Sequence, residues 1–81
     1  MEILEFAKAA TRVGTIEMKE ERNGWSVAFR ERVSGKWISC TQQTGGVRTW
    51  KSPSVLINQQ REAGYRGTVV FPVSAQMHLE I

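Results

Sequence analysis

The sequence predicts a single α+β domain: an N-terminal helix, a twisted antiparallel meander of four to five strands, and one helix before the last strand. Two patterns lead to this prediction. Apolar residues recur at helical spacing near the N-terminus and again after residue 52, whereas between these segments they alternate with polar residues as in strands. The length of 81 residues fits one domain, over residues 1–81, and is too short for two.

The first predicted helix covers residues 2–11. Its buried face would be formed by Ile3, Phe6, Ala7 and Ala10, which follow the helical period. Glutamates in the first turn and basic residues near the end suit the helix dipole. A strand is the alternative for so short a segment.

Two predicted strands follow, over residues 15–22 and 25–33, and a hairpin joins them. Asn23-Gly24 predicts a type I′ turn, because both residue types tolerate the positive φ angles that this turn requires. The second strand would turn four bulky apolar side chains to the core: Trp25, Val27, Phe29 and Val33. The side chains on its outward face would be Ser26, Ala28, Arg30 and Arg32.

A third strand is predicted over residues 37–43 and a short fourth strand over residues 47–50, each entered through a glycine-containing turn. Ile38 and Cys40 alternate with Trp37, so one of these two sets must face away from the core. The pattern leaves open whether Trp37 and Trp50 are core or surface residues.

A second helix is predicted over residues 53–63. Ser52 is a typical N-cap, Pro53 suits the first helical position, and Gly64 suits a left-handed C-cap. We expect its partly apolar face to consist of Val55, Leu56, Gln59 and Ala63. Gln60 would lie on the exposed side.

The C-terminal region predicts a buried strand over residues 68–73, with Pro72 at an edge or at the strand's end. The tail over residues 75–81 alternates Met77, Leu79 and Ile81. It would form an edge strand, a segment that pairs two copies into a homodimer, or a loosely held terminus.

The composition argues against an enzyme. The chain has one His, one Cys and no Asp, and it lacks the paired Cys or His spacing of a zinc site. Cys40 lies on an expected buried face, where it would act as a small apolar residue, and His78 is expected to be an exposed side chain. We therefore expect no catalytic residue, no metal and no cofactor.

The expected compartment is the cytoplasm. No apolar run approaches the roughly 20 residues that a membrane span needs, and the N-terminus lacks the apolar core of a secretory signal. The net charge of +3 favours contact with nucleic acid or an acidic protein, although glutamates lie among the arginines.

The expected function is binding through the uncovered face of the sheet. An exposed Trp beside arginines could stack on bases or fill a pocket of a partner. The candidate residues are Arg30, Arg32, Trp37, Arg48, Trp50 and Lys51. Alternatively, all three tryptophans close the core and the arginines only face water.

A short pattern of aromatic, Gly, Arg and Lys-Ser positions covers roughly residues 14–73. Its members are Trp25, Gly45, Arg48, Trp50, Lys51, Ser52, Gly64 and the run 69–73. In this pattern the chain resembles small plasmid-borne proteins of the ParC-like partition-associated group. The resemblance implies an accessory protein of a mobile element that acts in plasmid maintenance. The polar run Asn58-Gln59-Gln60 departs from what a helix packed on a sheet would show.

The predicted partner is DNA or a DNA-bound protein. The alternative is a protein-interaction module or an inhibitor of a host enzyme, such as a defence or replication protein. Such a module could be a homodimer. No membrane partner is expected.

Overall fold

The computed structural model describes residues 1–71. The elements in this range are α1 (Ile3–Val13), β1 (Thr15–Glu21), β2 (Gly24–Arg30), β3 (Trp37–Ser39), α2 (Pro53–Glu62) and β4 (Thr68–Val70). The predictions for Pro72, for His78 and for the tail over residues 75–81 lie outside the described residues.

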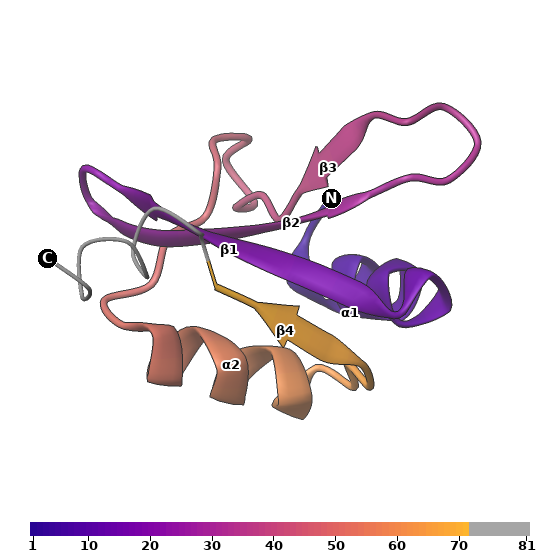
Figure 1. Ribbon diagram of the computed structural model, residues 1–81. Helices are drawn as coiled ribbons and strands as arrows, with labels where there is room; N and C mark the ends of the chain where they lie inside the picture. Colours follow the sequence, from indigo (N-terminus) through magenta and orange to yellow (C-terminus); the bar gives the residue numbers. More distant parts are fainter. Residues whose placement is uncertain (72–81) are drawn as a thin grey trace, which may run out of the picture.

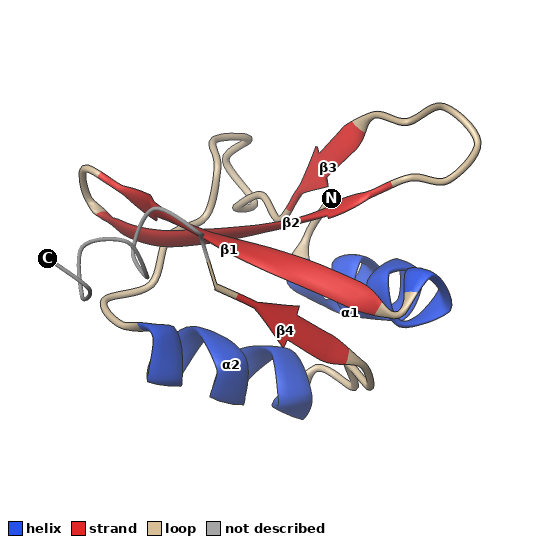
Figure 2. Cartoon of the chain, viewed as in Figure 1, coloured by secondary structure: helices blue, strands red, loops and turns tan. Residues whose placement is uncertain are grey.

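Within residues 1–71 the strands form one mixed sheet in the order β3-β2-β1-β4. β1, β2 and β3 are antiparallel neighbours, whereas β4 runs parallel to β1, with Val69 opposite Ile16. Both helices lie below the sheet in the view of Figure 1, and Figure 2 shows no helix above it. The sheet therefore has one covered face and one open face.

The predicted fold class is confirmed: the protein is α+β, with an N-terminal helix and a helix before the last strand. The antiparallel arrangement is correct for β1 to β3 and wrong for β4. The connection through α2 carries the chain across the covered face, so β4 enters the sheet beside β1 in the same direction as β1, as helical crossovers commonly do.

Some predicted strands are shorter in the structure. The fourth strand expected over residues 47–50 forms only two isolated bridges, Thr41 with Val47 and Trp25 with Trp50. β2 ends at Arg30, so Val33 lies in the following loop, where it is 98% exposed and not part of the core. β4 is an edge strand of three residues with exposed ends and not a buried strand.

The predicted β1–β2 hairpin forms, but it turns at Arg22-Asn23, one residue earlier than predicted, and the turn is not type I′. Asn23 has no positive φ, and Gly24, at φ +141°, is already the first residue of β2. A Cβ atom on Gly24 would collide with the backbone carbonyl oxygen of Trp50. The glycine therefore allows the segment that holds Trp50 to pair closely with Trp25, whose N–H donates to the same oxygen at 2.7 Å.

The core lies between the covered face and the two helices. The apolar stripe predicted for α1 is confirmed, because Phe6, Ala7 and Ala10 are buried. The Phe6 ring packs against Phe29 of β2 with ring centres 5.2 Å apart. Further buried apolar side chains are Ile16, Met18, Val27, Cys40, Trp50, Leu56 and Tyr65.

The ends of α2 follow the sequence, but its buried face does not. The Ser52 Oγ accepts a hydrogen bond from the Val55 N–H at 3.3 Å, and Gly64 has φ +103°, as predicted. The fully buried residues of α2 are Leu56 and Gln60, whereas Val55 is exposed. Gln60, expected to face water, therefore lies inside the protein.

Candidate functional site

The open face of the sheet carries small side chains in its middle. The strand register places Glu17 of β1, Ala28 of β2 and Ser39 of β3 in one row across the sheet. Ser26 follows on β2, opposite Lys19. Residues that are paired in register point to the same side of a sheet. The small side chains of Ala28, Ser39 and Ser26 therefore lie together and form the floor of a depression in the open face.

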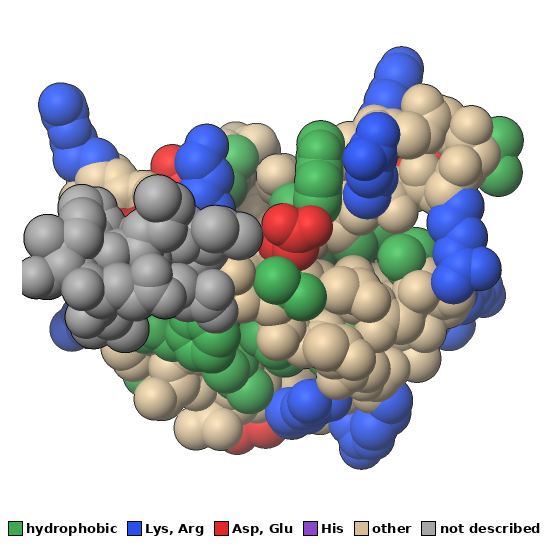
Figure 3. Space-filling view, viewed as in Figure 1, with side chains coloured by type: hydrophobic (Ala, Val, Ile, Leu, Met, Phe, Trp, Pro, Cys, Tyr) green, Lys and Arg blue, Asp and Glu red, His purple; other side chains and the backbone are tan. Residues whose placement is uncertain are grey.

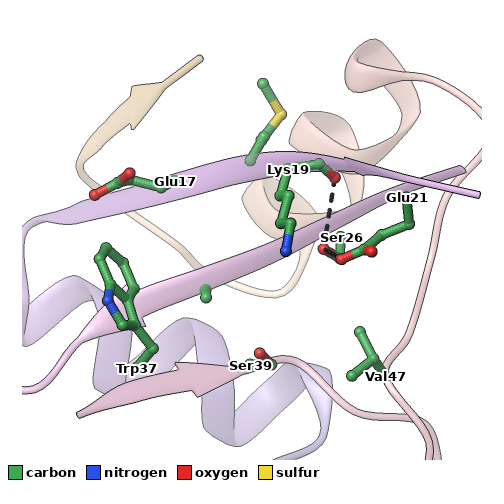
Figure 4. A pocket seen from close by; sticks show the side chains of 9 residues that line it. Glu17, Lys19, Glu21, Ser26, Trp37, Ser39 and Val47 are labelled. Carbon is green, nitrogen blue, oxygen red and sulfur yellow. Dashed lines mark hydrogen bonds between the residues drawn. The ribbon is translucent and has the colours of Figure 1, made fainter. Parts of the chain in front are cut away.

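A hollow of about 470 Å³ lies over this floor. Figure 4 shows Trp37 at one end and Val47 at the other, with Lys19 and Glu17 on the β1 side. The residues that line it are Glu17, Met18, Lys19, Glu21, Ser26, Ala28, Trp37, Ser39 and Val47. Its size falls within the range of about 300–1,000 Å³ that is typical of protein binding pockets.

Trp37 is the largest exposed side chain of the hollow. It is 51% exposed and lies opposite Arg30 in the β2–β3 pairing. Val47, at the other end, is 47% exposed. An aromatic ring that is half free of the protein offers a large contact area, and Trp is over-represented among residues that dominate binding energy.

The charged residues of the open face balance one another. Glu17 and Glu21 lie on β1 together with Lys19, and Arg30 ends β2. The Ser26 hydroxyl, which is almost fully buried, donates a hydrogen bond of 2.7 Å to Glu21 Oε2 and so holds this carboxylate at the rim. Among the described strand residues, the open face therefore carries two acidic and two basic side chains and is neutral overall.

Within residues 1–71, the outer edge of β3 has backbone groups without a hydrogen-bond partner next to the hollow. The Cys40 N–H donates to the Val27 carbonyl at 3.1 Å, which directs the even-numbered residues of this segment toward β2. In antiparallel strands successive residues turn their N–H and C=O groups to opposite sides. Those of Trp37 and Ser39 consequently point away from β2, to the outside of the sheet.

The N-terminal residue occupies the next outward position along this edge. The Thr41 N–H donates to the Met1 carbonyl at 2.8 Å, and the N-terminal ammonium donates to Thr41 Oγ1 at 2.7 Å. The backbone of Met1 is thus hydrogen-bonded to the outer side of this segment at Thr41. It lies next to the outward-pointing backbone groups of Trp37 and Ser39.

The structure brings two of the six predicted site residues together on the open face, Arg30 and Trp37. Arg32 belongs to the loop after β2 and donates to the Val13 carbonyl at the end of α1, at 3.0 Å. Trp50 is only 6% exposed and belongs to the core. The guanidinium carbon of Arg48 lies 5.0 Å from the centre of the Trp50 ring. Lys51 is exposed, in the segment before α2.

Cys40 is fully buried beneath the sheet. Burial raises the pKa of its thiol, and the nearby Arg48 guanidinium opposes this increase only in part. A raised pKa keeps the thiol protonated and poorly nucleophilic at neutral pH. Within residues 1–71 no three His, Cys, Asp or Glu side chains lie close enough together to hold a metal ion.

Sequence reasoning missed two features of the surface. Val47 was placed on a fourth strand, and its position over the hollow depends on the bridge to Thr41, which joins segments on either side of a turn. Arg12, Arg61 and Arg66 were not considered, because they are far apart along the sequence. Contacts of the chain around the end of α1 bring them near Arg32.

No helix within the described part of the chain is long and apolar enough to cross a membrane. Comparisons with protein-family models, with curated proteins and with solved structures found no match to this chain.

Proposed function

We propose that the protein is a non-enzymatic protein-binding module that receives an extended segment of its partner on the open face of the sheet. The observation that carries this proposal is the hollow of about 470 Å³ beside the half-exposed ring of Trp37. Its small-residue floor leaves space for a partner side chain, and the Trp37 ring offers that side chain an apolar wall.

The charge of the open face supports a polypeptide partner over DNA at this surface. A phosphate backbone would meet Glu17 and Glu21 as well as Lys19 and Arg30. Surfaces that bind nucleic acid carry an excess of basic residues, because neutralising phosphates supplies most of the binding energy. A neutral face with an aromatic anchor is typical of contacts between proteins.

The free edge of β3 supports an extended conformation for the bound segment. The outward backbone groups of Trp37 and Ser39 can pair with a partner strand, and Met1 already pairs with the same side at Thr41. Added strands gain affinity from main-chain hydrogen bonds and specificity from side chains seated in neighbouring pockets. The hollow would take the side chain that projects onto the open face.

The resemblance to partition-associated proteins suggests a setting for this module. In that setting it acts as an accessory protein of a plasmid or another mobile element. Its partner is then a DNA-bound protein of that element, or a host enzyme such as a defence or replication protein that the module inhibits.

The proposal predicts that Trp37→Ala abolishes partner binding. Immobilised protein would be used to capture partners from a lysate of cells that produce it, and the recovered partner would be quantified by mass spectrometry. Truncating a central aromatic contact costs about 2 kcal/mol or more, which corresponds to at least about a thirtyfold loss of affinity. Trp37 is half exposed, so the fold should be retained, as a thermal unfolding curve would show.

Val33→Ala is the matched control, since Val33 is apolar and fully exposed but lies in the loop after β2. It should capture the partner like the wild-type protein. Equal recovery by the Trp37→Ala variant would show that the open face is not the binding surface.

A further inference from the structure

Four arginines gather around the C-terminal end of α1. Arg12 belongs to the last turn of α1, and Arg32 reaches the Val13 carbonyl from the loop after β2. Arg61 and Arg66 flank the chain reversal that follows α2. All four are exposed, and we refer to them together as the arginine end.

Backbone contacts tie the reversal after α2 to the end of α1. The Arg66 N–H donates to Thr11 Oγ1 at 3.1 Å, and the Thr68 N–H donates to the Gly14 carbonyl at 2.9 Å. These two bonds hold Arg66 and its neighbours beside α1, although the two segments are far apart in sequence. In Figure 3, Lys and Arg side chains lie along the right-hand and lower rim, over the ends of α1 and β4.

Three of these guanidinium groups are held in place by backbone carbonyls. Arg61 donates from Nη1 to the Tyr65 carbonyl at 3.2 Å and from Nη2 to the Gly67 carbonyl at 3.1 Å. Arg66 Nη1 donates to the Tyr65 and Arg61 carbonyls. Arginines near helix ends commonly bond to the last carbonyls, so these contacts also have a structural purpose.

The contacts leave most of the donors free and the charges intact. A guanidinium has five N–H donors. Within residues 1–71, Arg32, Arg61 and Arg66 each use only one or two of them, all to neutral carbonyls, and Arg12 uses none. Of the two carboxylates nearest in sequence, Glu31 accepts a hydrogen bond from the Ser34 hydroxyl and Glu62 follows Arg61. The four arginines outnumber these two carboxylates, which leaves this end of the molecule positively charged.

We propose that the arginine end binds the phosphate backbone of double-stranded DNA. Guanidinium groups bind phosphate oxygens through paired N–H bonds, and a side chain already held in place loses less entropy on binding. Within residues 1–71 the nearest aromatic residue in this region, Tyr65, is buried, so a platform for stacking unpaired bases is missing there. Contacts to a duplex backbone need none.

The arginine end and the hollow beside Trp37 consist of different residues, although they adjoin: Arg32 follows by two residues Arg30, which pairs with Trp37. From this end the open face runs toward the β1–β2 hairpin. DNA at the arginine end is a second partner, whether or not the open face binds protein.

The test is fluorescence anisotropy of a labelled duplex with the full-length protein, from 50 to 250 mM KCl (roughly the range over which phosphate contacts weaken by orders of magnitude). The wild-type protein should bind, with log K falling linearly against log salt concentration. The double variant Arg12→Ala/Arg32→Ala should reduce the magnitude of this slope by up to about 2, since each lost phosphate contact removes about 0.9. Its affinity at low salt should fall at least about tenfold.

These two arginines suit the test because Arg12 forms no side-chain hydrogen bond with residues 1–71 and Arg32 forms one exposed bond. The control is Arg22→Ala/Lys51→Ala, which removes the same charge from the β1–β2 turn and from the start of α2. The control should keep the wild-type slope.

Three results would overturn the proposal. The first is absence of binding at 50 mM salt, and the second is an equal loss in the control, which would indicate a general charge effect. The third is displacement by polyglutamate or by single-stranded DNA as effective as displacement by unlabelled duplex, which would assign the surface to polyanions in general.

Discussion

Trp25, Trp37 and Trp50 have three different surroundings. Trp50 is buried under the bridge to Trp25, Trp25 is half-buried at the border of the core, and Trp37 stands half free on the open face. Strand alternation placed Trp37 on the face opposite to Ile38 and Cys40 but left open which of these two faces is buried. The burial of Trp50 depends on a pairing between distant segments, which no local pattern records.

Cys40 provides a test of burial at the scale of one residue. Its pKa in the folded protein is raised, chiefly by burial, above the ordinary thiol value of 9.0. Below that value the folded and unfolded thiols are both protonated, so the full contribution to stability is present. As the pH rises through 9 and toward the folded pKa, unfolding releases a proton and the free energy of unfolding falls.

We predict that Cys40→Ala makes stability less sensitive to alkali. Urea unfolding of both proteins at pH 8 and at pH 10 would give the change in unfolding free energy for each. The change should be larger in the wild-type protein. Tyr65, whose pKa is also raised by burial, contributes equally to both proteins. An identical change in the two proteins would mean that the thiol is accessible to water in the folded state.

The elements differ in how far the sequence predicts them. α1 and the β1–β2 hairpin depend on neighbouring residues: an apolar stripe, alternation and a glycine at the turn. β4 depends on a partner far along the chain, and its parallel pairing with β1 could not be inferred from residues 68–73 alone. The open face was predicted because its alternation is local, whereas the arginine end was missed because tertiary contacts assemble it.

α2 is the element with the least favourable core contact. Its buried residues are Leu56 and Gln60. Neither Nε2 nor Oε1 of Gln60 has a hydrogen-bond partner among residues 1–71. A buried amide without partners costs free energy, because its hydrogen bonds to water are lost on folding.

We predict that Gln60→Leu raises the free energy of unfolding by about 1–2 kcal/mol, because it removes the unpaired amide at nearly constant volume. The measurement is urea denaturation followed by far-UV circular dichroism. Asn58→Leu is the control on the exposed side of α2 and should change stability by less than about 0.5 kcal/mol. A loss of stability in Gln60→Leu would indicate that the amide has a hydrogen-bond partner in solution.

At the scale of the whole molecule, the two layers produce two distinct surfaces. Both helices cover one face of the sheet, which leaves the other face for the hollow beside Trp37. The same packing brings the end of α1 against the chain after α2, which assembles the arginine end. One surface is neutral and aromatic and the other is basic, so we assign them to different partners.

The proposed binding of a protein partner to the open face beside Trp37 can be tested directly. Indole N–H signals in a ¹⁵N-correlated NMR spectrum report on the three tryptophans separately, and single Trp→Phe variants would assign them. On addition of the purified partner, the Trp37 signal should shift or broaden while the Trp50 signal stays in place. Saturating binding that leaves the Trp37 signal unchanged would contradict the claim.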